Sequence, residues 1–585
     1  MRSIKQTWKN CWKYFESRIG HPKQKKAVFI CCDDQYIPKS IIALKCFSHH
    51  NPDFNVYIIT SALSDENKDL CFEYDITPLV VDLSKDFDRL DERPYGKQYP
   101  LECFYHFYAY KLLKKYSFAI QIEPDVFTQR ALNLDWDAIE FVGGTSVNNY
   151  TIDKFFSILR DLDVLKKHFP NLNVHQNKLI SGFRIYNTRN LAKVNYYEEI
   201  VRLYKKSWDL GIPRSGDDSL NTLYQAIHPE HFTILDSKFH LLYPHSYALD
   251  NIRDIVHFHF SGPNPKWWTD ERPGHPMTLF FKSRFIEFLY NQFPVSFIEN
   301  YCKELYVPID HPSPVSFYYW NGAKNFGDWI TPYFLNKFCR SSDYRFDFKN
   351  EVRPKVLACG SIMRLCNKKS IVYGSGIRNA DQEVQCGHFE IVRGPLTRKR
   401  LMEVDCDCPP VYGDPALLLP LYYMPAKKGK RFNVGIIPHV IQYERVFDIY
   451  KDNNECKVID LGNENIEEVV DQMSECHCIV SASLHGLIVS DAYRIPNKWI
   501  QFSDEIFGDN TKFYDYFLSV QRVDQEFIDA RNYKKLDIRS VIQRIGPVQI
   551  DFDFQYLRDR MFFNEKGITP YVKYLYATMQ SDDST

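Results

Sequence analysis

The chain has 585 residues, 44% of them hydrophobic and 25% charged, which are the proportions of an ordinary globular protein. Its 73 basic and 74 acidic side chains leave a net charge of −1, and this balance excludes the strongly basic surface typical of nucleic-acid-binding proteins. Because a single hydrophobic core stops growing at about 250–300 residues, we expect two or three domains.

The N-terminal segment, residues 1–24, has the pattern of a basic amphipathic helix. Apolar side chains recur at helical spacing among lysines and arginines, namely Ile4, Trp8, Trp12, Phe15 and Ile19. Two interpretations stay open, a helix docked on its own domain and a helix lying on an anionic membrane surface. No secretory signal and no run of about 18 apolar residues is present. The sequence therefore predicts a cytoplasmic protein that is at most peripheral at a membrane.

The 16 cysteines are scattered through the chain rather than laid out as a disulfide framework. We expect free thiols in a reducing compartment. Two closely spaced pairs, Cys406 with Cys408 and Cys476 with Cys478, raise the question of zinc. Neither has a second pair at zinc-finger spacing, so the pattern does not favour a metal there.

The first half alternates short apolar runs with helix-length segments. The runs at 28–32, 56–59 and 118–122 predict a mostly parallel sheet within an α/β fold. The third run leads directly into Glu123 and Asp125. Two carboxylates at positions i and i+2 after a strand can face the same cleft, where they supply the oxygen ligands that Mn²⁺ or Mg²⁺ prefers.

Further motifs of this half occur in a characteristic order. They are 32–38 (Cys-Asp-Asp-Gln-Tyr-Ile-Pro), 108–112 (Tyr-Ala-Tyr-Lys-Leu), 180–187 (Ile-Ser-Gly-Phe-Arg-Ile-Tyr-Asn), 216–221 (Gly-Asp-Asp-Ser-Leu-Asn) and 257–267, which runs from His257 to Trp267. Together they resemble glycosyltransferase family 8, whose retaining members use nucleotide sugars. The resemblance implies a GT-A domain over residues 25–300 and a UDP-sugar as donor.

The same resemblance implies roles for individual residues. It places the metal on Glu123, Asp125 and His259, with His257 as an alternative ligand two positions earlier on the same strand face. The nucleoside is expected at Asp33, Asp34 and Tyr36, and the diphosphate at Lys111, Gly262 and Lys266. The sequence departs from the family pattern in four places: Glu123 and Lys111 replace an aspartate and an arginine, Gly216 replaces an acid, and Lys266 is displaced by one position in the closing motif.

A proline-rich segment, 301–314, separates the two halves, because a helix cannot continue through it. The second half then predicts a domain over 315–545 made of two Rossmann-like halves, about 315–427 and 428–545. Within it, the apolar run ending at Val480 and Ser481 leads into a tight turn and a helix that carry His485. Such turns present side chains at the carboxyl edge of a parallel sheet. Residues 546–585 are expected to form a packing helix and a tail.

Six further motifs accompany the histidine helix. They are Asn-Phe-Gly-Asp at 325–328, Gly-Ser-Gly-Ile at 374–377, Val-Arg-Gly-Pro-Leu-Thr at 392–397, Gly-Asp-Pro-Ala-Leu-Leu at 413–418, Gly-Ile-Ile-Pro-His at 435–439 and Phe-Tyr-Asp-Tyr at 513–516. In this order they resemble the polysaccharide pyruvyltransferase family, which moves pyruvate from phosphoenolpyruvate to a sugar. The resemblance implies a GT-B-like arrangement of the two halves around a cleft.

The family likeness also implies the site residues of the second half. It makes His485 the general acid or base, with His439 and Asp328 in the same cleft, Arg393 on the donor, and Asn325 and Ser483 beside it. Ser483 stands where some relatives carry a donor-binding arginine, so Arg378 or Arg398 would supply that charge. Asp328 and Asp414 are also compatible with simple loop capping.

The sequence thus predicts a bifunctional enzyme of glycan assembly. One domain would transfer a sugar with Mn²⁺ or Mg²⁺, and the other would form a pyruvate ketal on a glycan acceptor. Two alternatives stay open, a pyruvyltransferase with a non-catalytic glycan-binding first domain and a scaffold of a capsule-assembly complex.

Overall fold

The computed structural model describes residues 25–89, 100–169, 171–212, 216–242, 255–260, 266, 276–306, 314–348, 353–426, 429–504, 508–531, 535 and 537–581. The basic N-terminal segment, Gly262 and residues 307–313 of the proline-rich segment fall outside these ranges. The chain divides into two compact units, Met1–Phe285 with Glu299–Glu304 and Ile286–Ile298 with Leu305–Thr585. Each unit is described by itself.

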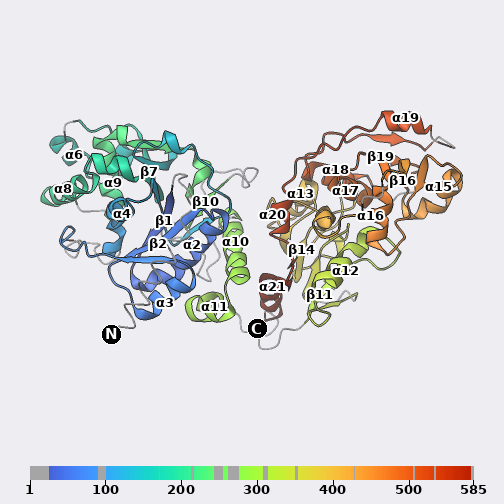
Figure 1. The fold of residues 1–585 in the computed structure, drawn as a ribbon, viewed down its shortest axis with the longest axis horizontal. Coiled ribbons are helices and arrows are strands. Elements are labelled where there is room, and N and C mark those ends of the chain that lie inside the picture. The colour runs from blue at the N-terminus through green and yellow to red at the C-terminus, as the bar shows by residue number, and fades with distance from the viewer. Residues whose placement is uncertain are drawn as a thin grey trace. The chain divides into compact units, whose positions relative to one another are not determined.

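The first unit is built on a seven-stranded sheet in the order β3-β2-β1-β4-β7-β6-β8 (Figure 1). Its strands are β1 (Lys26–Cys31), β2 (Phe54–Thr60), β3 (Thr77–Val80), β4 (Phe118–Ile122), β6 (Val142–Thr151), β7 (Asn177–Asn187) and β8 (Phe232–Leu235). Strands β1 to β4 run parallel, β7 is antiparallel to both neighbours, and β6 and β8 are parallel. The predicted mostly parallel α/β sheet is therefore confirmed.

Burial explains why these segments become strands. All five residues of β4 are buried, and β1 is buried along its centre. A strand covered on both faces needs a continuous apolar run, which the sequence supplies at both places. The helices of this unit are α2 (Ile37–His50), α3 (Asp65–Glu73), α4 (His106–Leu112), α5 (Ile152–Ile158), α6 (Leu162–His168), α7 (Thr188–Lys193), α8 (Tyr196–Asp209) and α9 (Gly216–Ile227), followed by α10 (Pro276–Gln292) and α11 (Val295–Tyr301).

A small three-stranded sheet lies at the carboxyl end of β4. It consists of β5 (Val126–Thr128), β10 (His257–His259) and β9 (Leu241–Leu242), in that order. Strands β5 and β10 are antiparallel, and their register sets His259 opposite Val126. This pairing places His259 next to Glu123 and Asp125, the two acids that follow β4.

The second unit contains two five-stranded parallel sheets. The first has the order β12-β11-β13-β14-β15, with β11 (Val315–Tyr318), β12 (Tyr344–Phe346), β13 (Lys355–Leu357), β14 (Ser370–Tyr373) and β15 (His388–Ile391). The second has the order β17-β16-β18-β19-β20, with β16 (Phe432–Ile437), β17 (Cys456–Val458), β18 (Cys476–Ser481), β19 (Asn497–Gln501) and β20 (Phe527–Asp529). Two Rossmann-like halves are thus present, as the sequence predicts.

Helices connect these strands in the crossover manner of parallel sheets. They are α12 (Phe326–Phe338), α13 (Pro395–Met402), α14 (Leu419–Tyr422), α15 (Tyr443–Tyr450), α16 (Ile466–Ser474), α17 (Leu484–Ala492) and α18 (Thr511–Ser519). Three further helices follow the last strand of these sheets, namely α19 (Ile538–Gln543), α20 (Phe554–Arg558) and α21 (Pro570–Ser581). Helix α21 packs on the first sheet, where the Tyr571 hydroxyl donates to Glu390 at 2.8 Å and the Tyr576 hydroxyl lies 2.8 Å from Ser316 Oγ.

One expectation about the cysteines requires correction. Cys386 and Cys406 form a disulfide that links the segment before β15 to the chain after α13. The sequence did not indicate this pairing, because the two residues are 20 positions apart and the near neighbour of Cys406, Cys408, is not its partner. Cys408, Cys476 and Cys478 are buried free thiols.

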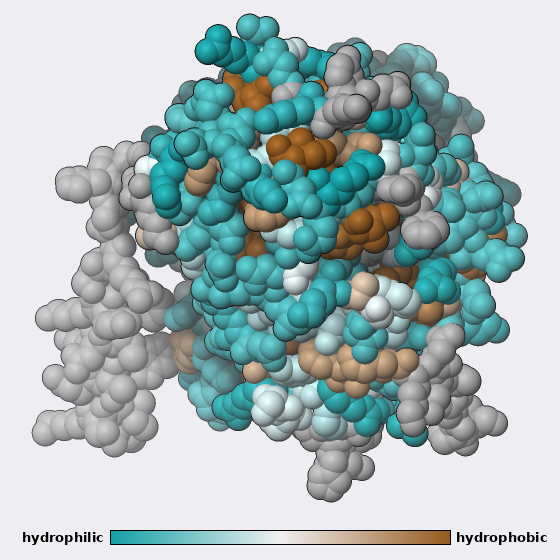
Figure 2. All heavy atoms as spheres, turned by 90° about the vertical axis from the view of Figure 1, so that its right-hand side faces the viewer, coloured by the Kyte–Doolittle hydropathy of each residue, from teal (hydrophilic) through white to brown (hydrophobic). Residues whose placement is uncertain are grey.

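Figure 2 shows one face, on which hydrophilic residues predominate and hydrophobic side chains form small separate groups. Among the described residues, none of the helices is long and apolar enough to cross a bilayer.

Candidate functional sites

The acidic pair that follows β4 meets a histidine from β10. His259 Nε2 lies 3.1 Å from Glu123 Oε2 and 3.2 Å from Asp125 Oδ1. The antiparallel pairing of β5 and β10 causes this meeting, because it sets His259 opposite Val126, the residue after Asp125. The three side chains that the sequence assigns to a metal are therefore brought together.

Opposite charges within the cluster shift the pKa values of its members. Burial alone would raise the pKa of Asp125, but the positive charges of His259 and Lys266 lower it to about 2. Burial alone would lower the pKa of His259, yet Asp125 and Glu123 raise it to about 9. A divalent cation would supply the same compensation, and two carboxylates with one imidazole form a donor set that suits Mn²⁺.

Two neighbours hold the His259 ring in place. His240 Nε2 lies 3.2 Å from His259 Nδ1, and His240 is itself buried. On another side the ring rests against Gly182, where an added Cβ would lie 2.3 Å from His259 Cε1. Gly182 has φ of +90°, which L side chains rarely adopt. The ring is thus oriented before any ion binds, as metal-binding histidines usually are.

The alternative ligand His257 has a different environment. Its Nδ1 lies 3.0 Å from Thr128 Oγ1, and its ring stacks on Phe47 with centroids 5.8 Å apart. Burial lowers the pKa of His257 to about 3. His257 is therefore a neutral core residue, and His259 is the histidine of the cluster.

The residues expected to hold the nucleoside lie directly after β1. Asp33 accepts a hydrogen bond from the Tyr36 amide at 3.1 Å, and Asp34 accepts one from the Ser64 amide at 2.9 Å. Tyr36 is exposed. Asp33 and Asp34 therefore shape the turn after β1, and Tyr36 presents an aromatic ring to solvent beside it.

The two lysines expected at the diphosphate are engaged with protein groups. Lys111 pairs with Glu198 of α8. Lys266 contacts the Asp125 carboxylate and donates to the Phe260 carbonyl at 2.6 Å. Lys266 thus joins the cluster of Glu123, Asp125 and His259, whereas the structure does not bring Lys111 to that cluster.

A buried polar group near this edge was not singled out from the sequence. His106 on α4 lies 2.8 Å from the Tyr186 hydroxyl through Nδ1 and 3.0 Å from Asp217 Oδ2 through Nε2. Arg184 lies 3.7 Å from the same carboxylate. The acid of the 216–221 motif was visible, but its partner depends on the packing of α4 against α9 and could not be read from the chain.

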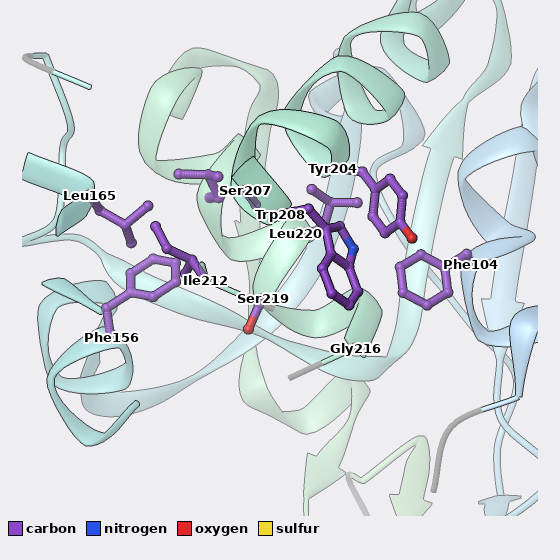
Figure 3. Close-up of a pocket in the computed structure, with 11 residues that line it drawn as sticks. Phe104, Phe156, Leu165, Tyr204, Ser207, Trp208, Ile212, Gly216, Ser219 and Leu220 are labelled. Atoms are coloured by element: carbon purple, nitrogen blue, oxygen red, sulfur yellow. The ribbon is translucent and has the colours of Figure 1, made fainter. Parts of the chain in front are cut away.

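A small cavity of the first unit has a volume of about 30 Å³. Figure 3 shows apolar side chains that line it, among them Phe156, Leu165, Trp208 and Leu220. None of its described lining residues carries a carboxylate, imidazole or cationic group. It belongs to the packing between helices α6, α8 and α9 and coincides with neither polar cluster.

In the second unit, His485 is the second residue of α17, directly after β18. Its Nε2 lies 3.2 Å from Cys359 Sγ and 3.6 Å from Asp414 Oδ2. All three side chains are buried, and Asp414 Oδ1 accepts from the Ala416 amide at 3.0 Å. Cys359 was not predicted, because it follows a three-residue strand and belongs to no motif that suggests chemistry.

The other face of the His485 ring lies against the start of α12. An added Cβ on Gly327 would lie 1.8 Å from His485 Nδ1, so only glycine fits. Asp328 follows directly, and its Oδ2 accepts from Asn325 Nδ2 at 2.7 Å. The Asn-Phe-Gly-Asp motif therefore provides a cap, a space for the imidazole and a carboxylate.

Burial raises the pKa of Asp328 to about 6, although His485 and Asn325 oppose the shift. A carboxyl group that changes charge near neutrality can both donate and accept a proton. Asp328 is only 6% exposed, so its charged form is poorly solvated.

The raised pKa predicts a pH-dependent stability. Because the folded pKa of about 6 lies above the ordinary value, the stabilising contribution of Asp328 is present below about pH 4 and is lost as the pH rises through 6. The loss is on the order of 3 kcal/mol. We therefore expect Asp328→Asn to gain stability relative to wild type between pH 4 and pH 8 in urea unfolding. The exposed Asp452→Asn serves as control, and parallel stability curves for Asp328→Asn and wild type would contradict the assignment.

Two cations and a second histidine complete this cluster. Burial, with Lys512 and Arg378 nearby, lowers the pKa of His439 to about 4. Burial and the neighbouring arginines lower the pKa of Lys512 to about 8, while Asp328 opposes that shift. His439 also caps a short helix, with Nδ1 3.5 Å from the Ile441 amide. Arg378 and Lys512 are therefore the cations in electrostatic contact with Asp328 and His439.

Arg393, which is expected to contact the donor, is engaged with protein groups. It is fully buried, and Nε donates to Asp515 at 3.1 Å while another nitrogen donates to Ser361 at 2.7 Å. Its third nitrogen contacts Asp515 and the Ile377 carbonyl. Arg393 thus ties α13 to α18 and presents no nitrogen to solvent, which leaves Arg378 as the exposed arginine of the cluster.

The remaining predicted residues lie at helix starts. Asn325 caps α12 by accepting from the Gly327 amide at 3.3 Å. Ser483 precedes α17, and its amide donates to Ser481 Oγ at 3.1 Å. Arg398 points elsewhere and donates to the Cys408 carbonyl at 2.9 Å. The second cluster therefore collects Asn325, Ser483 and the titratable groups at two helix N-termini, which favour anions.

Comparison with known proteins connects the second cluster to a family. Residues 286–500 match the family model for polysaccharide pyruvyl transferase, and the match begins where the second unit begins. An uncharacterized protein of Acanthamoeba polyphaga mimivirus, L143, is 30% identical over 188 residues, which are 31% of this chain and 63% of that protein. The chain thus spans less than two thirds of that relative.

Solved glycosyltransferases resemble parts of the chain at low sequence identity. The bifunctional glycosyltransferase WbbM is 14% identical with a TM-score of 0.37 and covers 49% of this chain and 52% of its own. The galactosyltransferase LgtC is 14% identical with a TM-score of 0.34, and the match covers 45% of this chain and 94% of the LgtC chain. GlyE of Streptococcus pneumoniae is 10% identical with a TM-score of 0.31, and the match covers 83% of this chain and 95% of the GlyE chain.

Proposed function

We propose that this chain is a bifunctional enzyme of glycan biosynthesis. Its first unit would transfer a sugar from a nucleotide sugar with the help of a metal ion, and its second would transfer pyruvate from phosphoenolpyruvate to a sugar. One observation supports the proposal above all others. Each unit gathers a titratable cluster at the carboxyl end of its parallel strands, where α/β proteins bind their ligands.

In the first unit, Glu123, Asp125 and His259 would hold Mn²⁺ or Mg²⁺, which supplies positive charge to a departing nucleoside diphosphate. The protein groups do the positioning. His240 and Gly182 fix the His259 ring, and Lys266 offers a further cation once an ion takes over its contact with Asp125.

In the second unit, the chemistry requires a proton donor, a proton acceptor and cations. The methylene carbon of phosphoenolpyruvate gains a proton, and a sugar hydroxyl adds to the cationic carbon 2 and loses its own proton. A second hydroxyl then displaces phosphate and closes the ketal. Asp328 and His485 provide the two proton-transfer groups, and His439 faces the same charges. Arg378 and Lys512 suit the carboxylate and phosphate of the donor.

A second function for the first unit has specific support. Lys111 is held by Glu198, and Lys266 occupies the metal cluster through Asp125. A unit in which these contacts persist would bind a glycan or nucleotide without transferring a sugar. The pyruvyl transfer of the second unit would be unaffected.

The wild-type chain tests both halves in one assay. It is incubated with phosphoenolpyruvate, a panel of UDP-sugars and simple glycosides, with Mn²⁺ or with a chelator. We expect phosphate release that depends on the glycoside, and UDP release that stops when the metal is removed. Phosphate release without UDP release would support the non-catalytic first unit. No phosphate release with any glycoside would contradict the pyruvyl transfer.

A further inference from the structure

A third titratable cluster lies in the first unit, outside the residues assigned to either reaction. It consists of His228, Glu230 and His231, at the turn that joins α9 to β8. Each of the three offers a ligand atom, and these atoms lie within 4.8 Å of one another. We propose that this His-Glu-His cluster is a second divalent-metal site, built for zinc or a similar late first-row ion.

Local backbone geometry brings the two imidazoles together. Pro229–His231 form a single turn of 3₁₀ helix, which has three residues per turn, so the side chains at positions i and i+3 lie one above the other. The His228 and His231 rings accordingly stack with centroids 5.1 Å apart and planes 12° apart. A proline at the first helical position stabilises this turn, because its φ is already set.

The distances agree with coordination by one ion. Glu230 Oε1 lies 3.5 Å from His228 Nδ1 and 3.9 Å from His231 Nε2. Nitrogen and oxygen ligands about 2.0–2.2 Å from a tetrahedral zinc ion are separated from one another by about 3.3–3.6 Å. The ligand atoms of His228 and His231 lie within 4.8 Å of each other, so a shared ion requires small rotations of the two imidazoles as well as of the exposed Glu230.

His231 is oriented before an ion arrives. Its Nδ1 lies 2.8 Å from the Tyr224 hydroxyl, and its ring packs on Phe141 with centroids 4.3 Å apart. A hydroxyl that accepts from Nδ1–H leaves the Nε2 lone pair directed toward Glu230. A hydrogen bond of this kind on the far nitrogen is the usual support of a metal-binding histidine.

The surroundings leave space for further ligands. The two histidines line an open hollow of about 570 Å³ together with Asn195, Glu198 and Glu199. Glu198 and Glu199 are paired with Lys111 and Arg202, so they contribute shape and local charge rather than free ligands. Water can complete the coordination in this hollow. Two imidazoles favour zinc, nickel or copper, whereas manganese and magnesium prefer oxygen-rich sites such as the Glu123 cluster.

Zinc binding to the full-length chain tests the proposal. The chain is stripped of metal, and Zn²⁺ is titrated by calorimetry in a Glu123→Gln, Asp125→Asn background that disables the first cluster. We expect His231→Ala to lose one equivalent of zinc. We expect Glu230→Gln to weaken that equivalent at least about tenfold and Tyr224→Phe to weaken it about 10–100-fold. His175→Ala is the matched control, since His175 is an exposed histidine of the same unit.

Glu230→Gln keeps the experiment decisive if the histidine variant folds poorly, because the Glu230 side chain is 64% exposed and its loss should not disturb packing. Zinc should also raise the melting temperature of the parent background but not of His231→Ala. An unchanged zinc count and affinity in both His231→Ala and Glu230→Gln would overturn the proposal. So would a Tyr224→Phe variant that binds zinc as tightly as its parent.

Discussion

Gly327→Ala is expected to reduce phosphate release from phosphoenolpyruvate by about 100-fold or more. The new methyl group would lie 1.8 Å from His485 Nδ1, so either the imidazole or the start of α12 must move. A displacement of about 1 Å in a reacting group can cost about 100-fold in rate. Both Asp328 and His485 would be displaced, because Gly327 directly precedes Asp328 in α12 and packs against the His485 ring. The measurement is steady-state phosphate release with a glycoside that the wild type accepts.

Gly546→Ala is the matched control, since no atom lies within 4 Å of the position that its Cβ would take. It should retain wild-type activity. UDP release by the first unit should also survive Gly327→Ala, which would show that the chain remains folded. Wild-type pyruvyl transfer by Gly327→Ala would mean that proton transfer does not depend on the position of the His485 ring against Gly327.

Gly182→Ala should cause a comparable loss in the first unit. Its methyl group would lie 2.3 Å from His259 Cε1 and would push the ring away from Glu123 and Asp125. We expect the apparent affinity for Mn²⁺ to fall about 10–100-fold, as when a support of a metal-binding histidine is lost. Mn²⁺ titrations of UDP release measure this directly.

The backbone itself requires a control, because alanine is strained at the Gly182 φ of +90°. Gly211 also has a positive φ, +69°, but no atom lies within 4 Å of its added Cβ. Gly211→Ala therefore carries the backbone strain without the steric clash. If both variants lose metal affinity equally, strain rather than the His259 contact is responsible, and the proposed role of Gly182 fails.

Much of the fold was predictable because it follows from local pattern. The mostly apolar run of β4 is typical of a strand buried on both faces, and the acids that follow it are expected at its carboxyl end. The strand, turn and helix around His485 are equally local. His259 needed more than pattern, since only the β5 and β10 pairing decides that it, and not His257, meets the acids.

Other features depend on packing between distant segments. The motif around Arg393 indicated a functional cation, but its role is decided by Asp515, which is 122 positions away and fully buried. Lys111 is likewise directed by Glu198 on another helix. The Cys386–Cys406 disulfide and the partners of His106 belong to the same class. In each case the kind of side chain could be read from the sequence, but the residue with which it pairs is decided by the tertiary structure.

Two independent active sites in one chain should give two separable losses of activity. Phosphate release from phosphoenolpyruvate and UDP release from a UDP-sugar are measured in parallel for wild type, His485→Ala and Asp125→Asn. We expect His485→Ala to lose only phosphate release and Asp125→Asn to lose only UDP release. Loss of both activities in a folded variant, or retention of both activities in either variant, would show that the chain does not carry two independent sites at these residues.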